Sequence, residues 1–411
     1  MKKRMHHWLL QAATALAICA VPGVATAQTE LPPQLTQDPQ SDVPIAIQQL
    51  RWVMNDADVN ALTFRSMDTL FTTRSVPRSG PIWHLPREDH ALNYTYDYDG
   101  QSYTPKQFLD RTYTNALLVM KNGHIVYENY RNNTNPQTRF IGWSMTKSLT
   151  SILVGIALQE GRIKSLDDRI ETYLPELKGG GYEGVTIRQL LQMRSGVDYE
   201  ERYDFAHPGA AAKNHINALV KNVARFADPA RTIKRVETPG KTFEYRTLDT
   251  AVLGWLLEQV SGGNTLAGYM TQRLWEPLGA ESDGFFIMDG PPGVGREFNG
   301  AGYNATLRDF ARVGLMMMQG GRANGHQIVP EDWVKMSTAP TEGNGEGGYG
   351  MQWWTFGGGA YSAIGLQGQY IYVDPKTETI VVKLSYFPPG NMAASDETAA
   401  FLKATSAWSP E

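Results

Sequence analysis

The pattern of apolar and polar residues first becomes regular around position 115. In residues 115–130, "NALLVMKNGHIVYENY", two apolar runs flank Asn122-Gly123. This dipeptide accepts the positive φ angles of a tight type I′ turn, so the segment predicts a β-hairpin. The stretch from Ser148 to Gln159, "SLTSILVGIALQ", is apolar nearly all round and predicts a buried helix that Gly161 ends.

The middle of the chain is predicted to be mainly helical with long loops. Thr186 and Gln189 have the spacing of a capping box ahead of an apolar pair. A stripe of apolar residues with helical spacing then covers residues 248–260, and residues 306–319 predict a further helix. Residues 46–112, by contrast, show no strong period and predict an extended lead-in packed on the main body.

The last part of the chain changes to strand-like segments. "YGMQWWTF", "GAYSAIGLQGQYIYVDP" and "ETIVVKLSYF" are rich in aromatic and β-branched residues. We therefore expect an α+β fold, with a mainly antiparallel sheet flanked by helices and an inserted helical domain. The expected divisions are an N-terminal arm and lead-in at 28–112, a sheet domain from 113–165 plus 301–411, and a mainly helical domain at 166–300.

The N-terminus predicts export. Residues 1–27 have a basic start, a short apolar stretch and a final Ala-x-Ala, which is the pattern of a cleaved secretory signal peptide. The only cysteine, Cys19, lies within it and follows Ile18, where a lipoprotein signal needs a small residue. We therefore expect a periplasmic or secreted protein without a stable membrane anchor, and no cysteine chemistry or disulfide in the mature chain.

Composition and charge add two general constraints. Hydrophobic residues make up 42% and charged residues 19% of the 411 residues, as in a globular protein with a sizeable core. The formal net charge of −4 provides no basic field for nucleic acid. The composition leaves the oligomeric state open.

The segment "FIGWSMTKSLTS" at 140–151 carries the first candidate chemistry. Ser144 and Lys147 are three residues apart at the start of the predicted helix, so both side chains lie on one face. Such a serine can be an ordinary N-cap or a nucleophile whose neighbouring lysine accepts its proton. Thr146 excludes the α/β-hydrolase elbow, which needs glycine there. No His-Glu-x-x-His zinc motif occurs, and His207 is kept only as a loop candidate.

Two motifs later in the sequence make Ser144 and Lys147 a more specific indication of catalysis. Tyr245-Arg246-Thr247 precedes a predicted helix, and "AIGLQGQYIYVDP" places Gly365 on a late strand. With Ser144-x-x-Lys147, this resembles the penicillin-recognising serine hydrolases, that is, class C β-lactamases, DD-peptidases and related esterases. Within that superfamily, residues 60–405 are most similar to the 6-aminohexanoate-dimer hydrolase branch, whose "LLxMRSG"-like segment matches "LLQMRSGVDYEERYDF" here.

The resemblance implies a role for each matching residue. Ser144 would be the nucleophile, and Lys147 the proton acceptor or the group that tunes proton affinity. Tyr245 would be the general base and acid, as a phenolate favoured by the lysine charge. The backbone N–H groups of Ser144 and Leu366 would form the oxyanion hole.

Two further residues would bind the substrate. Gly365 would let it approach the strand, and Tyr203 would hydrogen-bond the scissile amide, with Tyr199 as the alternative tyrosine. No cofactor or metal is implied.

The sequence also departs from the family pattern. Thr247 replaces the asparagine of Tyr-x-Asn, and Ala363 and Ile364 replace the lysine and threonine of Lys-Thr-Gly. The residues for acyl transfer remain, whereas the lysine and the asparagine that help the family hold a β-lactam are replaced. We therefore expect an exported serine hydrolase that cleaves small esters or amides, 6-aminohexanoate oligomers included, through an acyl-enzyme. A β-lactamase or DD-peptidase and a non-catalytic binding or sensor module are the alternatives.

Export of the full-length chain from a secreting host should yield a protein that begins at Gln28. The reason is the Ala25-Thr26-Ala27 pattern after the apolar run. N-terminal sequencing of the exported protein measures the cleavage site. Full-length protein in the membrane fraction would contradict this prediction.

Overall fold

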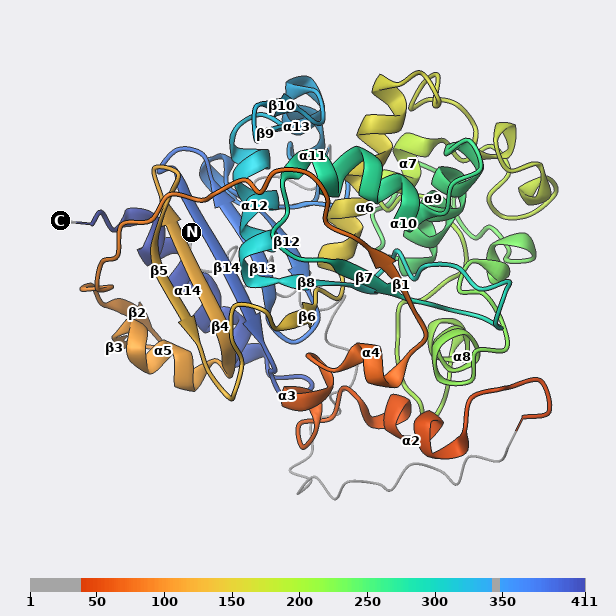
Figure 1. Cartoon of the computed structure of the whole chain (residues 1–411). Helices are drawn as coiled ribbons and strands as arrows, with labels where there is room; N and C mark the ends of the chain where they lie inside the picture. The colour runs from red at the N-terminus through yellow and green to blue at the C-terminus, as the bar shows by residue number, and fades with distance from the viewer. Residues whose placement is uncertain (1–37, 342–347, 411) are drawn as a thin grey trace.

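A computed structural model describes residues 38–341 and 348–410. The predicted signal peptide at 1–27 lies outside these residues. The main sheet has six antiparallel strands in the order β11-β12-β13-β14-β4-β5 (Figure 1). Their bounds are β4 Thr114–Lys121, β5 His124–Tyr130, β11 Trp354–Thr355, β12 Tyr361–Gly365, β13 Gln369–Asp374 and β14 Thr379–Ser385. Both halves of the chain contribute strands, and the predicted α+β fold class is confirmed.

The predicted hairpin is the β4–β5 pair. Lys121 pairs with His124, and Asn122 and Gly123 between them have φ values of 50° and 79°. Positive φ at both central positions is what a type I′ turn requires. This early hairpin forms one edge of the sheet and pairs with the late strand β14.

Helices cover both faces of this sheet. Leu117 and Val119 of β4 join an apolar cluster under α5 and α14, whereas Leu118 and Met120 join the cluster that contains α6 and α12. Because successive side chains alternate between faces, a strand covered on both sides is apolar throughout. The bounds of these helices are α5 Pro105–Arg111, α6 Met145–Gln159, α12 Leu307–Met318 and α14 Met392–Ala407.

A second, four-stranded sheet has the order β1-β7-β8-β6. Its strands are β1 Thr73–Val76, β6 Arg139–Ile141, β7 Gly284–Ile287 and β8 Tyr303–Thr306. Strand β6 leads directly into the segment that carries Ser144. Two short hairpins complete the strands, with bounds β2 Tyr96–Tyr98, β3 Gln101–Tyr103, β9 Arg322–Ala323 and β10 His326–Gln327.

The lead-in differs from the extended segment we expected. It contains β1, β2, β3 and α5, and the short helices α2 Ile45–Val53, α3 Asn60–Thr63 and α4 Met67–Leu70. Arg51 on α2 shows why an irregular sequence is ordered here. Its buried guanidinium donates hydrogen bonds to the carbonyls of Leu70 and Leu219 and to Asn222. These are tertiary contacts that local periodicity does not encode.

The region between β6 and β8 is mainly helical, apart from β7. The capping box predicted at Thr186 and Gln189 is present at the start of α7. The helices are α7 Ile187–Leu191, α8 Ala210–His215, α9 Thr247–Val260, α10 Leu266–Met270 and α11 Glu276–Leu278, and α13 Glu331–Ser337 follows later. Short 3-10 or π turns lie at Ile170–Thr172, Pro175–Leu177, Ile216–Val220, Asp228–Arg231, Thr271–Trp275 and Gly357–Gly359. The domain divisions at 165/166 and 300/301 stay a prediction.

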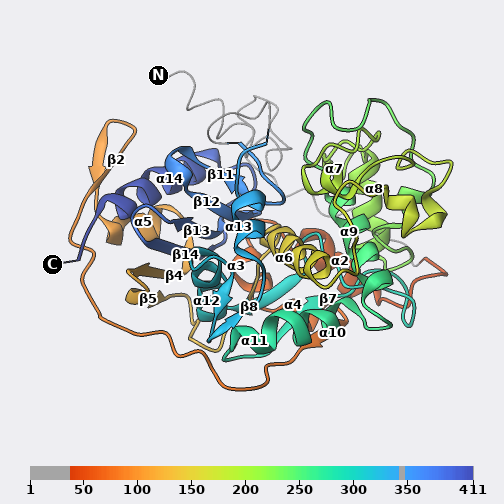
Figure 2. The same ribbon diagram turned by 90° about the horizontal axis from the view of Figure 1, so that it is seen from above.

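Helix α6 lies between the main sheet and the helical region (Figures 1 and 2). Buried polar side chains join the two sides around it. The Gln352 side chain accepts a hydrogen bond from Thr250 of α9 and donates to the carbonyls of Leu190 and Leu191, while its backbone carbonyl accepts from Ser148 of α6. A buried amide satisfied in this way fixes the geometry of the junction. Within the two described ranges, no helix has the length and apolarity that a bilayer crossing requires.

Candidate active site

The backbone makes a strained turn just before Ser144. Trp143 is buried with φ at 45°, an unusual angle for a large side chain, and its ring packs edge-on against Phe64. The turn places Ser144 at the N-cap of α6, yet its side chain makes no capping hydrogen bond. The hydroxyl is therefore available for chemistry, and the simple capping interpretation does not apply.

Lys147 lies one turn further on and is buried with 1% of its surface exposed. Its Nζ lies 2.9 Å from Ser144 Oγ and 2.8 Å from the carbonyl oxygen of Gly300, and donates to both. Burial lowers the pKa of Lys147 from its ordinary value of 10.5 to about 8. A useful fraction of neutral amine is thus present near neutral pH, positioned to accept the serine proton.

The segment 299–303 holds the second acceptor of Lys147 in place. Thr150 of α6 donates to the Asn299 carbonyl, and Asn299 donates to the carbonyl of Thr250 on α9. Three residues after Gly300, the backbone N–H of Tyr303 donates to the Thr146 hydroxyl. Thr146 and Thr150 of α6 therefore position the segment whose Gly300 carbonyl accepts a hydrogen bond from Lys147.

Tyr245 completes the cluster from the loop before α9. It is buried, and its ring centroid lies 4.9 Å from Lys147 Nζ and stacks on Trp354 at 5.7 Å. Burial raises the pKa of Tyr245 far above its ordinary value, while a hydrogen bond with Ser144 opposes the rise. The negative charge of Glu201 raises it further. The resting site therefore holds a phenol, not the phenolate that we expected.

The end of β12 lies against the serine turn. A Cβ atom added to Gly365 would lie 2.1 Å from the Gly142 carbonyl oxygen and 3.1 Å from Trp143 Cβ. Only glycine allows this close approach of two backbones. Gly365 thus brings the following residue, the partly buried Leu366, towards the start of α6, as a two-sided oxyanion hole requires.

The remaining candidates separate clearly. The Tyr203 hydroxyl donates to Glu201 Oε1 at 2.6 Å. Tyr199 is buried in the core, where its hydroxyl accepts from Asn214. His207 is a surface residue with 88% of its side chain exposed, 3.7 Å from Asp204. Tyr203 is thus linked through Glu201 to Thr247, whereas Tyr199 lies in the core and His207 at the surface, and the role of each stays a prediction.

Sequence reasoning missed Glu201, which belongs to the buried surroundings of the site. Its carboxylate accepts from the backbone N–H and the hydroxyl of Thr247, as well as from Tyr203. In the sequence it stands in "DYEERYDF", where a glutamate next to other charges looks like part of a solvated surface. No sequence signal marks it. Thr247, noted as a departure from the asparagine pattern, is the residue that binds it.

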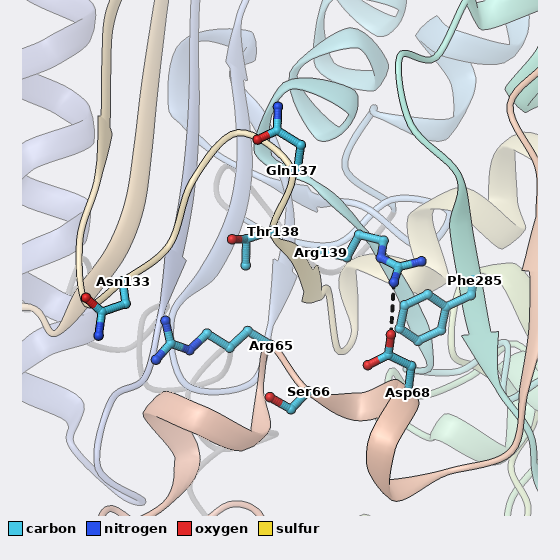
Figure 3. A pocket seen from close by; sticks show the side chains of 8 residues that line it. All are labelled: Arg65, Ser66, Asp68, Asn133, Gln137, Thr138, Arg139 and Phe285. Carbon is cyan, nitrogen blue, oxygen red and sulfur yellow. Dashed lines mark hydrogen bonds and ion pairs between the residues drawn. The ribbon is translucent and has the colours of Figure 1, made fainter.

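A polar surface pocket of about 350 Å³ lies beside β6 and the lead-in (Figure 3). Ser144, Lys147 and Tyr245 are not among its lining residues. Its two arginines are both engaged, because Arg139 pairs with Asp68 and stacks on Phe285, and Arg65 donates to the Asn132 carbonyl. These contacts attach the lead-in helices to β6, the strand that leads to the serine turn.

Comparison with known proteins identifies the family of the chain. Residues 106–405 match the beta-lactamase family model, so the chain belongs to the beta-lactamase family. It is 35% identical to the 6-aminohexanoate-dimer hydrolase of Paenarthrobacter ureafaciens over 354 residues, which cover 81% of this chain and 87% of that protein. The chain is a serine hydrolase of the beta-lactamase-related type.

Solved structures show the same fold. A Bacillus anthracis protein provisionally described as a 6-aminohexanoate-dimer hydrolase superposes with a TM-score of 0.76 at 25% identity, covering 86% of this chain and 95% of that one. A penicillin-binding protein from Bacillus halodurans superposes with a TM-score of 0.57 at 18% identity, over 73% of this chain and 99% of the other. The similarity to the penicillin-binding protein shows a shared fold only.

The variant Gly365→Ala should lose activity, because the added methyl group would displace the end of β12 from the serine turn. Loss of one oxyanion-hole donor lowers kcat on the order of 10²–10³-fold, and we expect a fall of this size. Steady-state kinetics with a p-nitrophenyl ester measure it. The matched control is Gly209→Ala, whose added Cβ would have no neighbour closer than 3.8 Å. Unchanged kcat in Gly365→Ala would refute the close approach.

Proposed function

We propose that the protein is an exported serine hydrolase that cleaves small linear amides and esters through an acyl-enzyme on Ser144. The observation that carries the proposal is the buried Lys147 ammonium, placed 2.9 Å from the serine oxygen. A lysine with so little solvent loses its proton more easily than a surface lysine. A binding module would have no need for a serine, a lysine and a tyrosine joined in this way.

Acylation starts with a proton transfer. Neutral Lys147 accepts the Ser144 proton while Oγ forms a bond to the substrate carbonyl carbon, and the carbonyl π electrons move to its oxygen. The backbone N–H groups of Ser144 and Leu366 bind that oxyanion. Tyr245 then donates its phenolic proton to the leaving nitrogen or oxygen as the bond to carbon breaks, and Lys147 returns a proton to Tyr245. Water repeats the sequence to release the acid.

The substrate class is supported by two observations. The relative from Paenarthrobacter ureafaciens is named for hydrolysis of a 6-aminohexanoate dimer, a linear amide. In this chain, position 363 is a buried alanine, and the Thr247 side chain is bound to Glu201. Two groups with which the family holds a β-lactam are therefore absent or engaged elsewhere, which supports linear amides and esters over β-lactams as substrates.

Treatment with a fluorophosphonate should add one phosphonyl group to the protein, and Ser144→Ala should abolish the adduct. Intact-mass spectrometry measures it. Ser151→Ala is the matched control, because Ser151 is also a buried serine of α6 but lies two turns from the site. An adduct that persists in Ser144→Ala, or disappears in Ser151→Ala, would contradict the assignment of the nucleophile.

The 6-aminohexanoate linear dimer and short-chain p-nitrophenyl esters should be hydrolysed with a higher kcat/KM than a cephalosporin. The missing charged contact at position 363 costs about ten- to a hundredfold for a substrate anchored through its carboxylate. Mass spectrometry of released monomer and absorbance assays measure the three rates, with Ser144→Ala as background. A preference for the cephalosporin would overturn the proposed substrate class.

A further inference from the structure

Gln367, the residue after Leu366, has a backbone conformation that glutamine rarely adopts. Its φ is 55°, in the left-handed region, and the residue is buried with 8% of its surface exposed. It belongs to the tight connection between β12 and β13, where Gly365 pairs with Gln369. A positive φ costs conformational energy in any residue that has a Cβ, so contacts with other segments have to hold Gln367 in this conformation.

One of these contacts comes from the lead-in. The Gln367 side chain donates a hydrogen bond from Nε2 to the carbonyl oxygen of Asn55 at 2.7 Å, across 312 residues of sequence. Asn60 of α3 adds an indirect link, because its side chain donates to the Phe387 carbonyl at 2.9 Å. The Phe387 N–H in turn donates to the Gln367 carbonyl at 3.1 Å. The side chain and the backbone of Gln367 are therefore both connected to the lead-in.

Gln369 holds the same connection from the side of the main sheet. It is buried, and its Nε2 donates to the carbonyls of Leu366, Gln367 and Ser385 at 3.2, 3.3 and 2.8 Å. Its Oε1 accepts from the Ser385 N–H at 3.1 Å. Side-chain amides thus fix the orientation of the two peptide groups that follow Leu366 and Gln367.

The same part of the lead-in also supports the serine turn. The Phe64 carbonyl, at the end of α3, accepts from the N–H of Ile141 on β6 at 2.9 Å. The Phe64 ring packs edge-on against Trp143, the residue before the nucleophile, with ring centroids 5.3 Å apart. Residues 55–64 therefore contact both segments that supply the proposed oxyanion hole, the serine turn and the β12–β13 connection.

We propose that Gln367 is a positioning residue that holds the Leu366 N–H in the oxyanion hole, by anchoring the β12–β13 connection to the Asn55 carbonyl of the lead-in. The placement of such a donor matters because it acts on the charge that develops on the substrate oxygen in the transition state. This inference rests on the proposed acyl transfer and gives the ordered lead-in a part in it.

A boronic acid reports on the oxyanion hole without turnover. The Ser144 oxygen donates a lone pair to the boron of phenylboronic acid, the serine proton passes to Lys147, and the boron becomes a tetrahedral anion. One boron-bound oxygen then takes the place of the substrate oxyanion, so affinity for the probe follows stabilisation of the transition state. A merely structural loss of folded enzyme would lower the measured turnover and leave the inhibition constant unchanged.

The variant Gln367→Met tests the contact, because methionine keeps the length and the unbranched Cβ of glutamine but has no side-chain N–H. We expect kcat/KM for p-nitrophenyl butyrate to fall about tenfold, less than the loss on the order of 10²–10³-fold for a whole donor. The inhibition constant for phenylboronic acid should rise by a similar factor. Gln367→Gly should behave in the same way, because glycine accepts the positive φ but also lacks the amide.

Gln48→Met is the matched control. Gln48 is also a buried glutamine, and its Nε2 donates to the backbone carbonyl of Val43 at 2.8 Å, but this contact stays at the N-terminal end of α2. The substitution should lower the melting temperature without changing kcat/KM per active site or the inhibition constant. Titration with a fluorophosphonate gives the concentration of active sites, and melting temperatures check the fold of all variants.

The outcomes are distinct. A lower kcat/KM with proportionally weaker inhibition in both Gln367 variants, and neither change in Gln48→Met, supports the inference. An unchanged inhibition constant in folded Gln367→Met, wild-type values in Gln367→Gly, or the same losses in Gln48→Met overturns it while leaving acyl transfer intact. A wild-type protein that hydrolyses no ester, binds no boronic acid and takes up no fluorophosphonate would instead contradict the proposed function, and this inference with it.

Discussion

The site depends on the exclusion of water from the Lys147 ammonium. An ammonium group is costly to bury, and here two acceptors offset part of that cost, the Ser144 hydroxyl and the Gly300 carbonyl. Because the compensation is partial, the pKa of the lysine falls towards neutrality. The burial that disfavours the ammonium form thus makes a neutral amine, which is a base, available next to the nucleophile. The surrounding contacts keep water away from Lys147 and hold it in place beside Ser144.

Rigidity comes from polar groups at the centre of the molecule. Asn299 and Gln352 are both buried, and each joins α6 to α9. Asn299 accepts from Thr150 of α6 and donates to the Thr250 carbonyl of α9, and Gln352 accepts from Ser148 of α6 and from Thr250 of α9. Such groups stabilise only one relative placement of the helices, because any shift would leave a buried donor or acceptor unpaired. The strained backbone at Trp143 is held by packing instead, because its buried ring lies against Phe64 and its Cβ lies close to Gly365.

Burial and the charge of Glu201 shift the pKa of Lys147 in opposite directions. Burial disfavours charge on both Lys147 and Tyr245. The Glu201 carboxylate acts in the other direction on the lysine and in the same direction on the tyrosine. The free site therefore keeps a proton on the phenol while leaving the amine near its point of titration. This division suits an acceptor for the serine proton and a donor for the leaving group.

The sequence alone determined the elements with strong local signals and the order of the motifs. The hairpin at Asn122, the capping box at Thr186 and the buried helix after Ser144 each follow from short-range rules of turn chemistry and periodicity. The ordered lead-in and the close approach at Gly365 were decided by contacts between segments far apart in the chain. Glu201 shows the reason most directly: it resembles a surface charge in the sequence, and only the packing of the α9 N-terminus against its loop removes it from water and gives it donors.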